Sequence, residues 1–247
     1  MPKSLPKYLD NAGVIGTPLS HKWNSDIGGS FYFGKDHNVK LYRAVDECQF
    51  KAKMALGVAI TEWAVWRFQG YVDLTDASNR VEAAWANVIE PPYSKSLKIK
   101  LKPTSGFANP EVEGPFQLIV GLLGEIRAYY ATGNIYLAEP IVKQAMLARH
   151  VLPNKQLFDN WLSESVRRIA EVFPRTGEYD KETEKYDSAH EIAVPREFFE
   201  PGFIYTTEAG RKLLHEFLNT LEFTKNPYLN SPEEMKTKGF QGTPYVL

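Results

Sequence analysis

Two strongly apolar stretches each carry one glutamate and one arginine, and these four residues have the types that ligand binding or acid–base chemistry needs. They are Glu62 and Arg67 in the first stretch, and Glu125 and Arg127 in the second. An isolated buried charge is costly, so each must be paired or must reach solvent. We expect a cross-helix ion pair, such as Glu62 with Arg127 or Arg67 with Glu125. The alternative is a polar cleft between the two helices, in which these residues bind a ligand or supply a general acid.

The spacings that mark metal sites, nucleophiles and phosphate loops do not occur in this sequence. His190 and His215 each precede a glutamate, but neither is followed by the second histidine that a helical zinc motif requires. Cys48 stands alone and is expected to be a small buried apolar residue, and the Gly-x-Ser-x-Gly motif does not occur. We therefore predict no metal and no cofactor, identify no catalytic residue, and favour a protein without enzymatic activity.

Aromatic residues make up 13% of the chain, and many lie outside the helical patterns. Four of them are candidates for a partner-binding surface: Trp23, Tyr32, Phe198 and Phe199. Exposed aromatic residues with a polar rim are typical of protein recognition sites. The alternative is that these side chains pin irregular segments onto the helical body.

Three lysines, Lys98, Lys100 and Lys102, alternate with aliphatic residues over residues 94–102. This period of two predicts a half-buried β-strand with a lysine face. The lysines are candidates for contacts with an acidic protein partner or with phosphates. Lysines on an edge strand also prevent aggregation, so a purely protective role is the alternative.

Six apolar or amphipathic stretches predict the helices that must position these residues. They span residues 46–70, 73–90, 116–133, 134–153, 155–173 and 206–223. Asn154 has the type of an N-cap, Gly133 follows the end of the third helix, and Ser231 begins a capping-box pattern that predicts one further short helical turn.

The first 45 residues are rich in turn-forming types and predict strands instead of helices. Residues 30–33 and 39–43 are short aromatic or β-branched runs around a turn, which predicts a β-hairpin. The whole pattern predicts a single mainly α domain of about six helices in antiparallel hairpins, with this N-terminal hairpin and one mid-chain strand. The expected parts are a turn-rich hairpin segment (1–45), a helical core (46–174), a long surface excursion (175–205), and a C-terminal helix and tail (206–247).

Composition excludes several classes of protein. With 29 basic and 30 acidic side chains the net charge is −1, which argues against a protein dedicated to nucleic acids or to membrane surfaces. The uncharged apolar runs are too short to span a membrane, and we expect a cytoplasmic chain.

The missing catalytic patterns and the aromatic surplus favour a protein–protein interaction module, such as a toxin-neutralising immunity protein or an adaptor. A protein partner is expected, and association into a homo-oligomer is left open. One alternative is a small-molecule-binding protein or hydrolytic enzyme that uses the polar cleft between the two central helices. Another is a structural subunit of a larger assembly, with residues 175–205 and the extended termini as docking segments.

Overall fold

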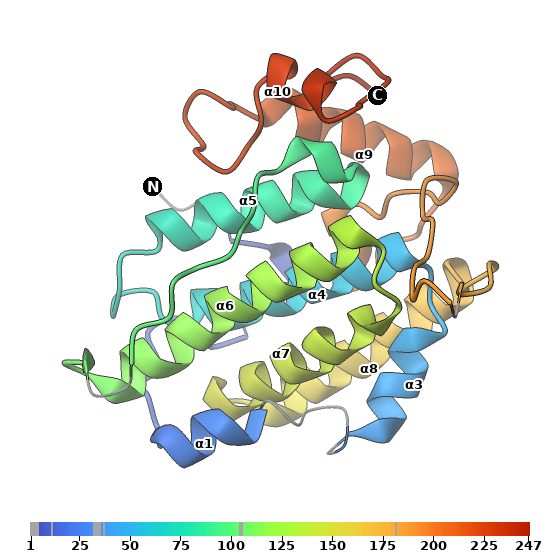
Figure 1. The fold of residues 1–247 in the computed structure, drawn as a ribbon. Coiled ribbons are helices and arrows are strands. Elements are labelled where there is room, and N and C mark those ends of the chain that lie inside the picture. The colour runs from blue at the N-terminus through green and yellow to red at the C-terminus, as the bar shows by residue number, and fades with distance from the viewer. Residues whose placement is uncertain (1–4, 11, 32–35, 37, 104–105, 181) are drawn as a thin grey trace.

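The most apolar stretch of the sequence forms a helix at the centre of the molecule. In the computed structural model, which describes residues 5–10, 12–31, 36, 38–103, 106–180 and 182–247, every residue of α4 (Phe50–Trp66) is buried. A helix that is apolar on nearly all sides has to be covered on all sides. Helices α5 (Thr75–Ile89), α6 (Pro110–Thr132) and α7 (Ala138–Val151) pack directly against α4 (Figure 1).

The remaining helices form an outer layer around this central group. Helices α3 (Val39–Asp46) and α8 (Lys155–Val172) pack against α7, and α1 (Ser25–Ser30) packs against α6. Helices α9 (Thr207–Thr220) and α10 (Pro232–Thr237) lie on the other side of the molecule, beyond α5 (Figure 1). The described residues contain nine α-helices, seven of them with eight residues or more, so the predicted mainly α single domain is confirmed.

Four short 3₁₀ turns complete the described secondary structure: η1 (Lys7–Leu9), η3 (Pro91–Tyr93), η5 (Ile135–Leu137) and η6 (Arg196–Phe199). Several helix ends follow the sequence signals. The Asn154 side chain accepts a hydrogen bond from Leu157 N at the start of α8, and α6 ends at Gly133 with a left-handed φ of 67°. Ser231 and Glu234 form the expected capping box at the start of α10.

The predicted N-terminal β-hairpin is wrong. Residues 39–43 belong to α3, whose N-cap is Asn38, and the Asn38 side chain accepts a hydrogen bond from Leu41 N. Ser30 is the last residue of α1, which Asn24 caps in the same way, while residues 32–33 lie outside the described residues. The asparagine caps and the packing of α3 on α7 and α8 override the β preference of the aromatic and β-branched residues.

The predicted mid-chain strand is also wrong, because residues 94–103 are extended but form no β-strand in the part of the chain that the structure describes. Ser94 makes an isolated antiparallel bridge with Leu229. The segment descends beside α6 instead (Figure 1). The expected alternation holds only in part: Leu97 is buried and all three lysines are exposed, but Leu101 is 49% exposed. Gly121 and Gly124 of α6 face this segment, and the bare Gly124 backbone lets the Leu97 carbonyl approach closely.

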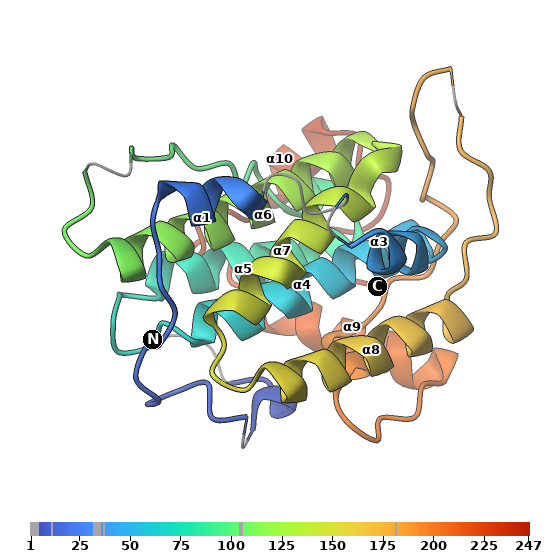
Figure 2. The same ribbon diagram turned by 90° about the horizontal axis from the view of Figure 1, so that it is seen from below.

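Residues 175–205 run partly over the surface, where the described residues of the loop at 176–190 project from the body (Figure 2). The second half of the segment returns to the core, where Val194 and Phe198 are fully buried. In the described part of the chain, no helix combines the length and the apolar character that crossing a membrane requires.

Candidate functional site

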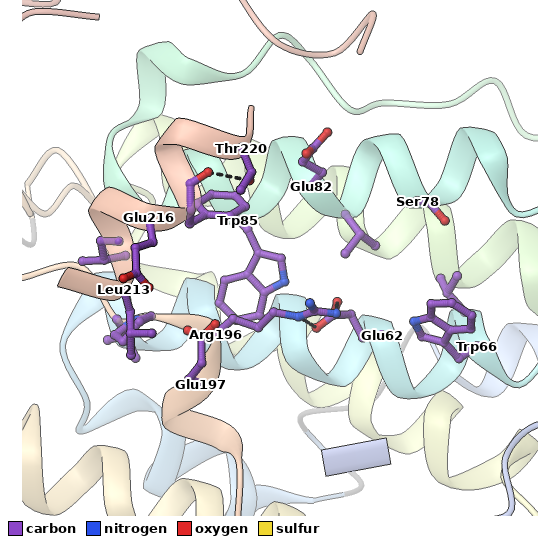
Figure 3. Close-up of a pocket in the computed structure, with 16 residues that line it drawn as sticks. Glu62, Trp66, Ser78, Glu82, Trp85, Arg196, Glu197, Leu213, Glu216 and Thr220 are labelled. Carbon is purple, nitrogen blue, oxygen red and sulfur yellow. Dashed lines mark hydrogen bonds and ion pairs between the residues drawn. The ribbon is translucent and has the colours of Figure 1, made fainter. Parts of the chain in front are cut away.

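A pocket of about 270 Å³ lies between α4, α5, α9 and the segment 194–197 (Figure 3). This volume is close to the lower end of the range of about 300–1,000 Å³ for small-molecule sites. The apolar part of its lining consists of Val65, Trp66, Val81, Trp85, Val194, Pro195, Leu213, Leu214 and Phe217. An apolar lining of this kind, with a few polar groups, is typical of ligand-binding pockets.

Helical spacing explains why these side chains meet. Val81 and Trp85 on α5 are four residues apart, as are Leu213 and Phe217 on α9, so each pair lies on one face of its helix. Both faces turn towards α4, which contributes Trp66 to the same pocket. Three helices and the segment 194–197 therefore form the walls of the pocket.

Glu62 lies at the pocket as part of a network of three side chains. Arg196 donates to both carboxylate oxygens, with Nη2 2.5 Å from Oε1 and Nε 3.1 Å from Oε2. The hydroxyl of Tyr8 also donates to Oε2. The network therefore joins α4 to η6 and to the N-terminal segment.

The charges within this network are fixed by its surroundings. Burial and the neighbouring Glu62 carboxylate raise the pKa of Tyr8 well above its ordinary value, so its hydroxyl stays protonated. Burial alone would lower the pKa of Arg196, but the Glu62 carboxylate raises it above the ordinary value. The pair is therefore a carboxylate and a guanidinium with a neutral tyrosine beside them.

Three further carboxylates line the pocket: Glu82, Glu197 and Glu216. Glu82 is buried on α5, and its Oε2 accepts a hydrogen bond from Asn226 Nδ2 at 2.8 Å. Glu197 is half-buried, and burial raises its pKa, with a smaller contribution from Glu200. Glu216 is exposed at the rim.

The Trp85 indole carries a buried polar group that the described residues leave without a partner. The residue is 5% exposed, and its Nε1 has no hydrogen-bond partner among the described residues. Figure 3 shows the indole in the middle of the pocket with its nitrogen towards the Glu62–Arg196 pair. A buried donor without an acceptor destabilises the structure by about 1–3 kcal/mol.

Of the four residues predicted for a cleft, only Glu62 lies at this pocket. Neither expected cross-helix ion pair forms in the described structure, because Glu62 pairs with Arg196 and Glu125 pairs with Lys143 of α7 at 3.2 Å. Arg67 donates to the carbonyl oxygens of four residues: Val14, Thr17, Pro18 and Val151.

The fourth residue, Arg127, also binds elsewhere. It donates to the hydroxyl and the carbonyl oxygen of Ser94 and so holds the start of the extended segment against α6. Both predicted arginines therefore fasten irregular segments to central helices. Neither contributes to a polar cleft.

The predicted partner-binding aromatics are mostly enclosed. Phe198 and Phe199 are 0% and 2% exposed, and Trp161 donates to the Phe199 carbonyl oxygen. Trp23 is half-buried and stacks on Phe31 with ring centroids 6.0 Å apart. These three side chains pin irregular segments to the helices, while Tyr32 lies outside the described residues. The lysine candidates Lys98, Lys100 and Lys102 are exposed.

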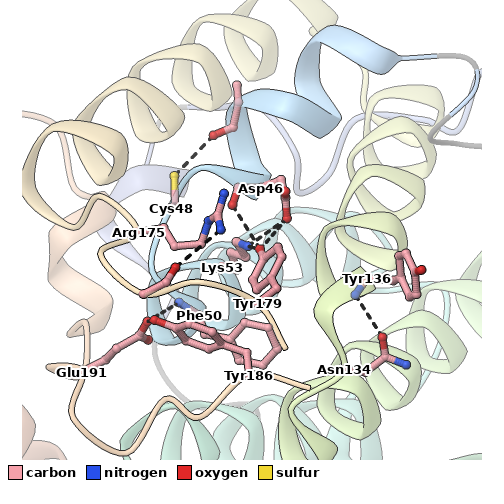
Figure 4. Close-up of polar contacts among 12 residues, drawn as sticks. Asp46, Cys48, Phe50, Lys53, Asn134, Tyr136, Arg175, Tyr179, Tyr186 and Glu191 are labelled. Atoms are coloured by element: carbon pink, nitrogen blue, oxygen red, sulfur yellow. Dashed lines mark hydrogen bonds and ion pairs between the residues drawn. The ribbon is translucent and has the colours of Figure 1, made fainter. Parts of the chain in front are cut away.

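A second polar cluster fastens residues 175–191 to the start of α4 (Figure 4). The ammonium of Lys53 is fully enclosed, 3.1 Å from Asp46 Oδ1 and 2.5 Å from the Tyr179 hydroxyl. Burial lowers the pKa of Lys53, and Asp46 opposes this effect. Because these groups satisfy one another and Lys53 has no exposed surface, the cluster is structural.

Within the described residues, no group of three or more histidine, cysteine, aspartate or glutamate side chains could hold a metal ion. Sequence reasoning missed most of the pocket. Val81 and Trp85 have the spacing of an ordinary core stripe, and Arg196 lies in a segment expected to be on the surface. Nothing in the local pattern indicates that these elements meet.

Comparisons with known protein families, with curated proteins and with solved structures found no match to this chain. Function is therefore inferred from the pocket alone.

Proposed function

We propose that this protein binds a small, largely apolar molecule in the pocket between α4, α5 and α9. The observation that carries the proposal is the buried Trp85 N–H, which lacks an acceptor among the described residues although its indole lines the pocket. The Nε1 atom itself has almost no surface that water can reach, so a ligand oxygen supplies the missing acceptor once the side chains over this atom move aside. Apolar contact with the surrounding helices supplies the remaining affinity.

The size of the pocket limits the ligand. A dry protein cavity of about 150 Å³ holds one benzene molecule. A pocket of about 270 Å³ therefore admits an aromatic ring with several further atoms. The ligand is of the size of a substituted phenethyl group.

Binding is proposed in preference to hydrolysis because Glu62, the acid expected from the sequence, is engaged on both oxygens by Arg196 and Tyr8. The roles as an immunity protein, an adaptor or a structural subunit stay predictions. Their main support was an exposed aromatic surface, and Phe198 and Phe199 are buried.

The proposal is tested by filling the pocket. Val81→Trp places an indole where Val81 now lines the cavity, and Val39→Trp places the same residue at an exposed position at the start of α3. The probes are methoxyphenethylamine, methoxyphenethyl alcohol and methoxyphenylacetate, measured by calorimetric titration. We expect at least one probe to bind the wild type and Val39→Trp, and not Val81→Trp.

A second variant guards against a folding defect in the first. Trp85→Phe keeps an aromatic ring in the pocket and removes the N–H donor. It is expected to weaken binding of a probe with an ether oxygen by about tenfold, the effect of one lost hydrogen bond. If no probe binds the wild type, or if Val81→Trp binds as tightly as Val39→Trp, the proposed function is wrong.

A further inference from the structure

The lining of the pocket carries an excess of negative charge. Its charged side chains are four glutamates and one arginine: Glu62, Glu82, Glu197, Glu216 and Arg196. One guanidinium balances the charge of one carboxylate, and Arg196 makes a two-point contact with Glu62. The excess negative charge therefore lies on the glutamates other than Glu62. The chain as a whole has a net charge of only −1.

Two of these carboxylates lie at the same end of the pocket. Figure 3 shows Glu197 and Glu216 together near α9, with Trp66 at the opposite end. Among the described residues no cation lies within ion-pair distance of Glu197, and the nearby Lys7 contacts Glu200 at 3.3 Å. In the part of the chain that the structure describes, the one cation near Glu216 is Lys212, at 3.8 Å and itself exposed on α9.

The position of Glu197 makes a positively charged partner more favourable for its carboxylate. It is half-buried beside an apolar lining, where water solvates a carboxylate less well than in the open. Burial accordingly raises the pKa of Glu197. A positive group in the pocket would stabilise the carboxylate form.

The indole of Trp85 is a second and independent sign of a ligand. The side chain is more than nine-tenths buried, lines the cavity, and has a donor without a partner in the described structure. Its aromatic face also suits a cation, since tryptophan is the strongest cation–π partner among side chains. The donor nitrogen and the two carboxylates lie on different sides of this ring (Figure 3).

Resting on the proposed function, we infer that the ligand is a small organic amine. Its ammonium lies at the α9 end of the pocket with Glu197 and Glu216, its apolar body lies along Trp85, and an oxygen at its other end accepts from Trp85 Nε1. The selectivity comes from charge, since a carboxylate of the same size would be repelled by both glutamates.

The three probes named above test this inference because they differ mainly in the group at one end, which is an ammonium, a hydroxyl or a carboxylate. In the wild type we expect the amine to bind about tenfold more tightly than the alcohol, as for one partly screened ion pair, and the carboxylate to bind most weakly. Glu197→Gln and Glu216→Gln should each reduce the preference for the amine and leave the affinity for the alcohol unchanged. Glu208→Gln, an exposed change on the same helix and outside this pocket, is the matched control.

The outcomes separate the inference from the proposed function. If the alcohol binds as tightly as the amine, or if Glu208→Gln reduces the preference as much as Glu197→Gln does, the charge selectivity is wrong while the pocket remains a ligand site. If none of the three probes binds the wild type, the proposed function itself fails. Circular dichroism and thermal melting of each variant confirm that the fold is retained.

Discussion

Cys48 lies in the short connection between α3 and α4, where its side chain has no exposed surface. Its thiol donates weakly to the Ala44 carbonyl oxygen at 3.4 Å. Burial raises the pKa of this thiol to about 12, so almost no thiolate exists near neutral pH. The expectation of a small buried apolar residue is confirmed.

We therefore predict that Cys48 does not react with Ellman's reagent in the native protein at about pH 8, because the thiolate is the reactive form. The same thiol should react with full stoichiometry once the chain is unfolded in guanidinium chloride. Native protein that releases one equivalent of the coloured product within minutes would contradict this prediction.

His21 takes the place of a helix hydrogen bond that the sequence removes. Pro115 lies inside α6 and has no N–H, so the Glu111 carbonyl four residues earlier lacks its usual donor. His21 Nε2 lies 2.7 Å from this carbonyl oxygen, which requires the proton on Nε2. Nδ1 of His21 is buried with no partner in the described structure.

Because burial lowers the pKa of His21 below 6.5, protonation favours the unfolded chain. Stability should be complete above the unfolded value and should decrease as the pH falls from about 6.5 towards the folded value, by at most about 1.4 kcal/mol per pH unit. His21→Gln keeps a donor for the Glu111 carbonyl and does not titrate.

We expect the free energy of unfolding of His21→Gln, measured in urea between about pH 7.5 and pH 5, to fall less steeply with decreasing pH than that of the wild type. Equal slopes would show that His21 does not contribute to the acid sensitivity.

At the scale of elements, the glycines of α6 decide where the extended segment lies. A β-carbon built on Gly124 would come within 2.7 Å of the Leu97 carbonyl oxygen, and the contact is with backbone, which cannot move aside easily. A β-carbon on Gly121 would meet only side-chain atoms of Leu101 and Ile99, at 3.4 Å and beyond. A larger residue at position 124 would therefore clash with backbone, whereas one at position 121 would only touch side chains, although both glycines lie on the same helix face.

This difference gives a matched pair of variants. Gly124→Ala should lower the free energy of unfolding by about 1–3 kcal/mol, because the extra carbon forces the segment away from α6. Gly121→Ala should be neutral or stabilising by up to about 1 kcal/mol, since alanine favours a helix. Chemical denaturation of both variants gives the comparison, and a Gly124→Ala variant as stable as Gly121→Ala would refute the role assigned to Gly124.

The helices were largely predictable because their signals are local. Apolar spacing and caps such as Asn154 and Ser231 act within a few residues, and the structure confirms them. The hairpin failed because Asn24 and Asn38 cap helices there, and the strand failed because strand formation needs a partner that no local pattern guarantees. Residues 94–103 have the alternation of a strand but find a helix with two glycines instead of a neighbouring strand.

The candidate site was harder to predict than the helices, since its parts come from distant regions of the sequence. A charge such as Glu62 in an apolar helix predicts that a partner exists, but does not say which residue supplies it. The partners are Tyr8 and Arg196, more than 50 and 130 residues away in the sequence. Only the packing of whole segments brings them together.

At the scale of the whole molecule, irregular segments close around α4 and provide partners for its polar groups. Residues 14–18 bind Arg67, which follows α4, and Tyr8 and Arg196 bind Glu62. The start of α4 depends on residues 175–191 in the same way. A loop that composition marks as a surface excursion is therefore needed to bury the central helix.

Glu191 provides the sharpest test of this dependence. The N-cap residue of α4, Gln49, makes no side-chain cap, and the two Glu191 carboxylate oxygens accept from Phe50 N and Lys51 N at 3.0 and 2.8 Å. The Tyr186 hydroxyl donates to the same carboxylate at 2.8 Å. A negative charge at a helix N-terminus is favourable, and here it is buried and bonded three times.

Glu191→Ala should lower the free energy of unfolding by about 2–3 kcal/mol, because it leaves two buried N–H groups without acceptors. Glu182→Ala removes the same charge from an exposed position in the same loop and should change stability by less than about 0.5 kcal/mol. Hydrogen exchange should show faster exchange at the start of α4 and across residues 175–191 in Glu191→Ala only. If the two variants are equally stable and equally protected from hydrogen exchange, the loop does not stabilise α4, and the packing of the other helices alone holds α4 in place.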